Sequence, residues 1–219
     1  PWQVAGNTES SYANHASGLP SSTDLRPALN SLLETLEQSG LDLTNYDQDG
    51  DGLIDSLVVL HSGYAAELGG TDCNSGSGPS DRIWSHSQGP QPNSWKSSTS
   101  DVGLGGYMIT SACRGTCGAN IARIGVIAHE LLHSWRLPYL YDQYGPLNPD
   151  GGGGGVGSYD IMSNPYGPSD DPVYPGHLSP WSKMQLGWLA PFEIQYNDVY
   201  NAGASESVPD VYRISTGYE

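Results

Sequence analysis

Basic side chains are scarce in this chain, and their scarcity excludes several classes of protein. Lys and Arg together number 8 among 219 residues, against 24 Asp and Glu, so the formal net charge is −16. A surface this acidic repels nucleic acid and anionic lipid. Long apolar runs are also missing: nowhere do 18 apolar residues follow one another, so we expect no membrane span. The excess of acids suits a secreted protein, and it equally suits one whose carboxylates hold cations.

Cysteines are few as well. Cys73, Cys113 and Cys117 allow one disulfide bond and one remaining thiol, and their spacing matches no Cys-rich zinc module. Cys113 and Cys117 could close a small loop, or Cys73 could pair with either of them. The chain starts PWQV, with no Met and no signal peptide, so we expect a processed or trimmed segment. A disulfide and the low Lys content suggest an extracellular setting.

Two catalytic signatures are absent too. The Ser-rich stretches contain no nucleophile elbow, and the glycine run has no adjoining GK[ST] that would bind phosphate.

What the sequence does contain is a set of periodic segments. It predicts helices over 22–39, capped by Ser22 or Thr23, over 120–136, capped by Asn120, and from Ser179 to Gly187. It predicts strands over 56–64, 81–87, 105–113, 192–196 and 210–216, and a flexible glycine loop over 151–157.

The second of these helices carries HELLH at residues 129–133. His129 and His133 are four residues apart, so on a helix both imidazoles project from one face. Two neutral imidazoles are good zinc ligands, and Glu130 beside them can take a proton from a zinc-bound water and pass it to a leaving amine. The competing interpretation is a core helix in which both histidines are satisfied by hydrogen bonds. We expect an apolar inner face formed by Ile121, Ile124, Ile127, Ala128 and Leu131.

The residues after HELLH choose between two classes of such enzymes. One class takes a later Glu as third ligand, and this chain has no Glu between Leu131 and Phe192. The other class takes a ligand six residues after the second His and supports the site with a Met-containing turn. SYDIMSNPYG supplies such a turn at Met162. The alternative for Met162 is an ordinary packed methionine.

These motifs, HELLHSWRLPYLYD, YDIMSNPYG and WSKMQLGWL, resemble those of the immune inhibitor A family of secreted, metzincin-like metalloproteases. The likeness covers roughly residues 10–190 and includes two further stretches, NYDQDGDGLIDSLVVLHSGYAAE and RIWSHS. The resemblance implies an α/β (α+β) metzincin-like peptidase domain: a twisted mixed sheet, an active-site helix beneath it and a Gly-rich lower lobe. It implies a single domain over 1–219, with an upper part to about residue 136 and a lower lobe over about 137–190. Residues 191–219 are expected to start a following region.

Two positions depart from the family pattern. The turn Gly of the family is Arg136 here, which would cost about 1–2 kcal/mol in a left-handed conformation. The Asp that serves the family as third zinc ligand aligns with Tyr139. Either the Tyr139 phenolate binds zinc, or Asp142 swings in, or the site is degenerate. Chemistry favours Asp142, since carboxylates are common zinc ligands, whereas the alignment favours Tyr139.

An Asp-rich loop, DQDGDGLID, predicts a second metal site. Asp47, Asp49, Asp51 and Asp55 occupy positions one, three, five and nine of a calcium loop, and the Leu53 carbonyl can add a ligand. Position twelve is Val58, so the loop is no full EF-hand, and Glu67 or waters would complete the shell. The alternative is a solvated acidic turn. We expect a structural calcium that makes stability depend on calcium.

The predicted function is zinc-dependent hydrolysis of protein or peptide substrates outside the cell by a protein that is expected to be a monomer. Met162 would form the floor of the site, and Tyr166 and His177 would line the cleft or stabilise the oxyanion. His61, His86 and His177 are each expected to be hydrogen-bonded structural residues and not metal ligands. The rival hypothesis is a non-catalytic, calcium-stabilised binding module derived from a metalloprotease that lost its third ligand. A third is an inactive fragment.

Overall fold

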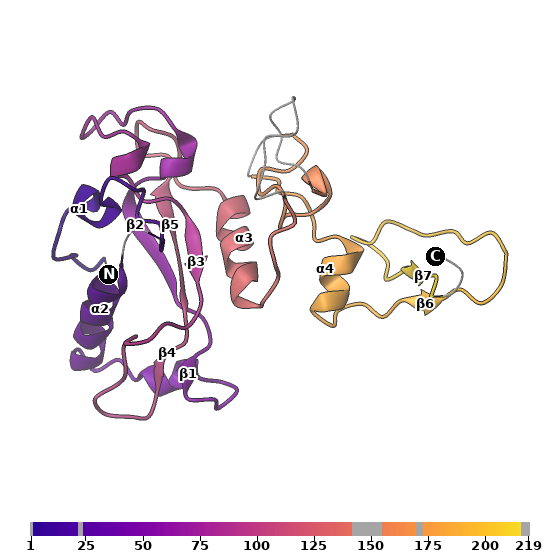
Figure 1. The fold of residues 1–219 in the computed structure, drawn as a ribbon, viewed down its shortest axis with the longest axis horizontal. Coiled ribbons are helices and arrows are strands. Elements are labelled where there is room, and N and C mark those ends of the chain that lie inside the picture. The colour runs from indigo at the N-terminus through magenta and orange to yellow at the C-terminus, as the bar shows by residue number, and fades with distance from the viewer. Residues whose placement is uncertain (1, 22–23, 142–154, 170–172, 216–219) are drawn as a thin grey trace. The chain divides into compact units, whose positions relative to one another are not determined.

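The structure is a computed structural model that describes residues 2–21, 24–141, 155–169 and 173–215. The chain divides into two compact units, residues 1–123 and 124–219, which are taken in turn (Figure 1). The active-site helix predicted over 120–136 falls mainly in the second unit. A single domain with an upper part to about residue 136 stays a prediction.

A three-stranded mixed sheet forms the centre of the N-terminal unit (Figure 1). Strand β2 (Val58–Tyr64) runs parallel to β5 (Tyr107–Cys113), and β3 (His86–Gln88) runs antiparallel to β5, so the order is β2-β5-β3. The predicted strands over 56–64 and 105–113 are therefore confirmed. The strand predicted over 81–87 is wrong for most of its length, because Ile83 N and Ser85 N donate to the carboxylates of Glu9 and Glu67 instead of to a neighbouring strand.

Helix α2 (Arg26–Gln38) confirms the first predicted helix, and its apolar side chains join two core clusters. Leu29 packs with β5 residues Tyr107 and Ile109, whereas Leu33 packs with Trp95 and Leu104. The helix ends before Gly40, whose φ of 93° permits the turn that stops it. Its predicted caps, residues 22 and 23, lie outside the described residues.

Several short elements have too little periodicity to be predicted. They are helix α1 (Glu9–Ala13), strands β1 (Leu53–Ile54) and β4 (Gly103–Leu104), which pair in parallel, and the 3₁₀ turns η1 (Leu43–Tyr46), η2 (Ala66–Leu68) and η3 (Pro79–Asp81). Helix α1 exists because the Thr8 side chain accepts from Ser11 N at its start and Asn14 ends it in a left-handed conformation.

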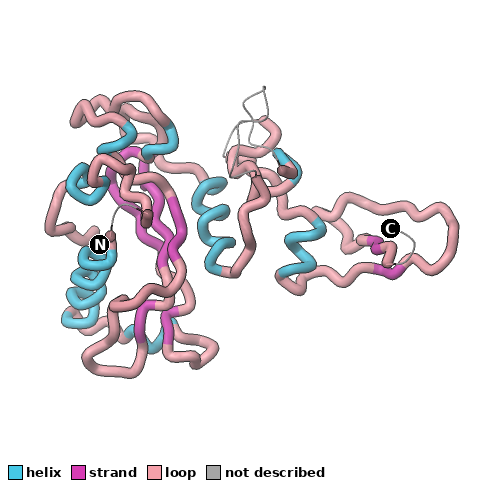
Figure 2. Tube along the Cα trace, in the orientation of Figure 1, coloured by secondary structure: helices cyan, strands magenta, loops and turns pink. Residues whose placement is uncertain are grey.

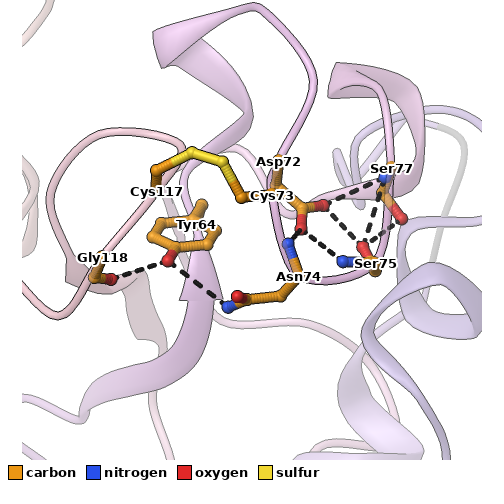
Figure 3. The surroundings of a disulfide bond; sticks show 8 residues. All are labelled: Tyr64, Asp72, Cys73, Asn74, Ser75, Ser77, Cys117 and Gly118. Atoms are coloured by element: carbon orange, nitrogen blue, oxygen red, sulfur yellow. Dashed lines mark hydrogen bonds between the residues drawn. A yellow bond between two sulfur atoms is a disulfide. The ribbon is translucent and has the colours of Figure 1, made fainter.

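A disulfide bond between Cys73 and Cys117 decides the pairing that the sequence left open (Figure 3). The two Cα atoms are 5.2 Å apart, across 44 residues of sequence. Beside it the Asp72 carboxylate accepts from the Ser75 hydroxyl and from the backbone N–H groups of Ser75, Asn74 and Ser77. These hydrogen bonds, that of the Ser75 hydroxyl first, lower the pKa of Asp72 to about 2. Cys113 is a free thiol.

The C-terminal unit contains helices α3 (Ile124–Ser134) and α4 (Pro180–Gln185), the 3₁₀ turn η4 (Gly157–Tyr159) and the parallel pair β6 (Phe192–Glu193) and β7 (Tyr212–Arg213). Figure 2 shows that loops make up much of it. Its core cluster combines α3, the segment after it, the Met162 turn and the segment that leads into α4: Leu132, Leu137, Ile161, Met162 and Leu178. Residues 151–154 of the predicted glycine loop lie outside the described residues.

The structure confirms the predicted cap of α4 and contradicts the predicted cap of α3. Helix α4 confirms its prediction, since the Ser179 side chain accepts from Ser182 N and Gly187, with φ of 72°, follows the helix. The predicted cap of the preceding helix, Asn120, is wrong. Its carbonyl accepts from Arg114 N, and Ile121 forms a bridge with Cys113, so these residues stay extended and α3 begins only at Ile124.

Candidate active site

Helix α3 places His129 and His133 one turn apart, and both rings turn toward one point. Their Nε2 atoms are 3.3 Å apart, and the ring centroids are 4.8 Å apart. The buried residues of the helix are Gly125, His129, Glu130 and Leu132. The predicted apolar face is therefore partly wrong, because Ile121 and Ile124 are exposed and Leu132, which was not predicted, is buried.

Each imidazole is held by a backbone carbonyl. His129 Nδ1 lies 2.8 Å from the Ile161 carbonyl, and His133 Nδ1 lies 2.8 Å from the Leu137 carbonyl. A carbonyl only accepts, so in each ring Nδ1 carries the proton and Nε2 presents a lone pair. Two lone pairs that face each other cannot form a hydrogen bond, and their approach is repulsive unless a cation lies between them.

The electrostatics of the pair favour neutral rings. Burial lowers the pKa of His129, and it lowers that of His133 to about 4. At neutral pH both histidines are therefore uncharged and able to act as ligands. The distance fits as well: two nitrogens on a tetrahedral zinc at its usual bond lengths lie about 3.3–3.4 Å apart. On donor type, protonation state and spacing, this pair suits a metal ion.

The helix ends in a turn that explains how the Leu137 carbonyl reaches His133. Arg136 N donates to the His133 carbonyl and Leu137 N donates to the Leu132 carbonyl, which together form a Schellman motif. Arg136 sits at the left-handed position of that motif, with φ of 67°. The turn directs the chain back along the helix, so that residues 137–141 pass beside the two imidazole rings.

Two tyrosines from this segment flank the pair. The Tyr139 ring centroid lies 4.1 Å from that of His133, and the Tyr141 ring is stacked with His129 at 6.4 Å. Burial, and after it the Glu130 carboxylate, raise the pKa of both phenols, that of Tyr139 to about 12. Glu130 is itself buried and close enough to act on both. Asp142 lies outside the described residues.

The predicted Met turn lies in the same unit. Met162 is fully buried, and its carbonyl accepts from Leu140 N, which ties the turn to the segment after α3. For the two residues expected at the cleft, the structure places Tyr166 N on Asn164 Oδ1 and His177 Nδ1 at 3.1 Å from the Leu178 carbonyl. Their part in oxyanion binding stays a prediction.

The Asp-rich loop of the N-terminal unit brings three of its four acids together. Carboxylate oxygens of Asp47, Asp49 and Asp55 lie within 4.8 Å of one another, and Asp51 is outside this group. Asp47 accepts from Gly50 N and Gly52 N, both in left-handed conformations that suit glycine. Glu67, expected as a further ligand, accepts from Ser85 N and Ser85 Oγ instead.

The other single histidines, His86 and His61, differ in their contacts. His86 Nδ1 lies 2.8 Å from the Trp84 carbonyl and His86 Nε2 lies 3.2 Å from the Tyr107 hydroxyl. The expectation that His61 is hydrogen-bonded is wrong: both of its ring nitrogens are buried without a hydrogen-bond partner among the described residues, although Nδ1 lies 3.3 Å from a Glu9 carboxylate oxygen. Burial lowers the pKa of His61 to about 4.

Comparison with known proteins identifies the family of this chain. The model of the immune inhibitor A peptidase M6 catalytic domain matches residues 1–189. This chain belongs to that family. The resemblance carried by the HELLH, Met-turn and WSKMQLGW motifs is thereby confirmed.

A relative adds detail. Immune inhibitor A of Bacillus thuringiensis subsp. alesti is 35% identical over 133 residues, which cover 53% of this chain and 18% of the relative. The chain thus spans less than a fifth of the length of the curated relative that it matches. The matching model is that of the catalytic domain of a metallopeptidase family. No helix within the described ranges is long and apolar enough to cross a membrane.

Sequence reasoning missed three features of this M6 site. Tyr141, two residues after Tyr139, is not among the predicted site residues, yet its ring stacks with His129. The carbonyls of Ile161 and Leu137 that hold the imidazoles carry no side-chain signal at all. Asp160 stands directly before the Met turn in YDIM, and the sequence does not show that it is 0% exposed in the folded chain.

Proposed function

We propose that this M6 chain is a zinc-dependent endopeptidase that acts outside the cell. The observation that carries the proposal is the His129–His133 pair: two Nε2 lone pairs 3.3 Å apart, each fixed by a carbonyl on the opposite ring nitrogen. His129 and His133 would hold the zinc, and a third oxygen would come from Tyr139 or Asp142. When bound, zinc supplies Lewis acidity, polarising the scissile carbonyl and lowering the pKa of a water.

Glu130 supplies the proton transfer. Its buried carboxylate follows His129 directly and lies near both tyrosines, so it is placed to take a proton at a carboxylate oxygen and to return it to the leaving amine. Met162, packed beneath the helix with Leu132, would form the floor. Tyr166 and His177 would stabilise the oxyanion.

The Asp-rich loop would hold a structural calcium. Asp47, Asp49 and Asp55 would be ligands, with Asp51 and the Leu53 carbonyl completing the shell. Clustered carboxylates repel one another, and a divalent cation would remove that repulsion. The disulfide between Cys73 and Cys117 supports an extracellular, oxidising setting. We further propose that the protein acts as a monomer.

Zinc content and Glu130→Gln together test the enzyme proposal. Protein never exposed to chelator should contain about one zinc per chain. Glu130→Gln should keep that zinc and lose casein cleavage by about 10²–10⁴-fold. The control, Glu34→Gln, changes an exposed carboxylate on α2 and should leave cleavage unchanged. Casein cleavage at the normal rate by Glu130→Gln would refute the role of Glu130.

Tyr139→Phe and Asp142→Asn assign the third ligand. Tyr139→Phe keeps the ring against His133 and removes only the hydroxyl, and Asp142→Asn keeps the shape of the side chain. A large loss of zinc affinity in one variant, measured by competition with a chromophoric chelator, identifies that residue. If neither variant changes an already weak affinity, the rival hypothesis of a non-catalytic, calcium-stabilised binding module is supported, because the third ligand would then be absent.

Calcium add-back tests the second metal. At constant zinc, calcium should raise the midpoint of thermal unfolding of dialysed protein. Asp49→Asn should abolish the rise, and Asp51→Asn, outside the group of three, should reduce it less. An unfolding midpoint that calcium does not move would contradict the site.

A further inference from the structure

One peptide group of the C-terminal unit connects a buried carboxylate to His129. The peptide between Ile161 and Met162 offers its carbonyl to His129 Nδ1 at 2.8 Å. Its N–H, on Met162, donates to Asp160 Oδ1, also at 2.8 Å. Because the N–H and C=O of a trans peptide point in opposite directions, the carboxylate and the imidazole lie at opposite ends of the same dipole.

Asp160 is well suited to anchor that peptide. It is 0% exposed, and its other oxygen, Oδ2, accepts from Ser179 N at 2.9 Å and from Ser182 Oγ at 2.5 Å, both at the start of α4. Its own carbonyl accepts from Ser163 N and Asn164 N, which closes the turn around Met162. Burying a carboxylate is costly unless donors surround it, and here donors from the turn and from α4 do so.

His133 provides an internal comparison. Its Nδ1 donates to the Leu137 carbonyl, whose peptide continues into Pro138. Proline has no N–H, so that peptide cannot be bound at its other end by a carboxylate. The carbonyl that holds His129 belongs to a peptide whose N–H binds a carboxylate, whereas the carbonyl that holds His133 does not. Asp160 can therefore act through a peptide on His129 and has no such route to His133.

We infer that Asp160 is a positioning residue for His129, which acts through the Ile161–Met162 peptide. A carboxylate on a peptide N–H polarises the group and makes its carbonyl a stronger acceptor. The stronger acceptor fixes the His129 ring with its proton on Nδ1 and makes Nε2 a better electron donor toward a metal. Ligand histidines commonly receive this support from a carboxylate that touches them directly. Here a backbone peptide stands between the two.

The predicted change in zinc affinity rests on the proposed metal site, whereas the predicted hydrogen bonding of His129 does not. Asp160→Asn should weaken zinc binding by about 10–100-fold, measured by competition with a chromophoric chelator. In metal-free protein, the Nδ1 proton resonance of His129 should move upfield, toward the position of a weaker hydrogen bond, while that of His133 stays in place. The NMR reading needs no zinc, so it remains informative even if the wild-type protein binds none.

Ser182→Ala is the matched control. It removes one hydrogen bond from the same carboxylate, on the oxygen that does not face Met162. A merely structural Asp160 predicts that Ser182→Ala and Asp160→Asn differ only in the stability they remove. Our inference predicts that Ser182→Ala lowers stability while zinc affinity and the His129 resonance remain those of the wild type.

Two results would overturn the inference. One is a folded Asp160→Asn protein with normal zinc affinity and an unmoved His129 resonance. The other applies if Asp160→Asn does not fold: wild-type protein should show a scalar coupling across the hydrogen bond between the Met162 amide nitrogen and the Asp160 carboxylate carbon. Absence of that coupling, while the Ser179 amide nitrogen couples to the same carbon, would show that the carboxylate does not bind the peptide.

Discussion

Arg136 holds a conformation that few side chains accept, and it does so just after helix α3 ends. Its φ of 67° is required by the Schellman motif that directs Leu137 back to His133. A residue with a Cβ pays a penalty of about 1–2 kcal/mol there, which glycine avoids. The strain lies close to His133, a proposed metal ligand, at a position where the M6 pattern has glycine.

Arg136→Gly should therefore stabilise the metal-free protein by about 1 kcal/mol, after allowance for the greater freedom of glycine in the unfolded chain. Arg136→Ala is the control, since it removes the charge but keeps the Cβ and with it the strain. Urea unfolding of the three proteins measures the difference. If the glycine variant is no more stable than the alanine variant, backbone strain at residue 136 is not the relevant quantity.

At the scale of elements, α2 is joined to the loop before β4 by one carboxylate. Glu37 accepts from Ser97 Oγ, from Ser98 N and Oγ, and from Thr99 Oγ1. The hydroxyls of Ser97 and then Ser98 do most to lower the pKa of Glu37 to about 2. The ionised form is thus favoured in the folded state.

This pKa gives a pH dependence with a definite sign. The folded pKa lies below the ordinary value of 4.5, so the contribution of Glu37 is complete above pH 4.5 and is lost as the pH falls toward about 2. Glu37→Gln should be less stable than wild type at pH 7, and the gap should narrow below pH 4.5. Glu34→Gln, exposed on the same helix, should show no such gap. Urea unfolding midpoints from pH 7 to pH 3 measure both, and a gap independent of pH would contradict the hydrogen-bonded carboxylate.

At the scale of the whole molecule, the N-terminal unit has a covalent link that the sequence could not assign. The Cys73–Cys117 bond closes a loop with a sequence separation of 44 residues. A cross-link restricts the unfolded chain, and for a loop of this length the chain-entropy model gives roughly 4 kcal/mol. The link thereby fixes the loop after β5 to the loop that carries Asp72 (Figure 3).

Replacing both cysteines with serine should lower the free energy of unfolding by roughly 3–4 kcal/mol, measured in guanidinium chloride. Reduction of the wild-type protein should have a similar effect. Cys113→Ser is the control, because Cys113 is a free thiol, and its stability should change by less than about 0.5 kcal/mol. A loss of stability in Cys113→Ser as large as in the double variant would mean that the bond pairs different cysteines.

Local pattern alone determined much of this protein. Helix α2, strands β2 and β5, and the cap and stop of α4 each depend on neighbours in sequence, and so does the spacing that puts His129 and His133 on one helix face. The motifs around them were enough to identify the M6 family. Where local pattern was weak or competed with distant partners, as at Asn120 and in residues 81–85, prediction failed.

The tertiary structure alone decided which groups hold the histidines. His129 meets a carbonyl 32 residues away, and Asp160 reaches α4 across 22 residues to Ser182. The cysteine pairing and the grouping of Asp47, Asp49 and Asp55 without Asp51 were also decided there. Such contacts depend on how the chain folds back on itself. Every residue has a backbone carbonyl, so the sequence cannot indicate which carbonyl will bind a histidine.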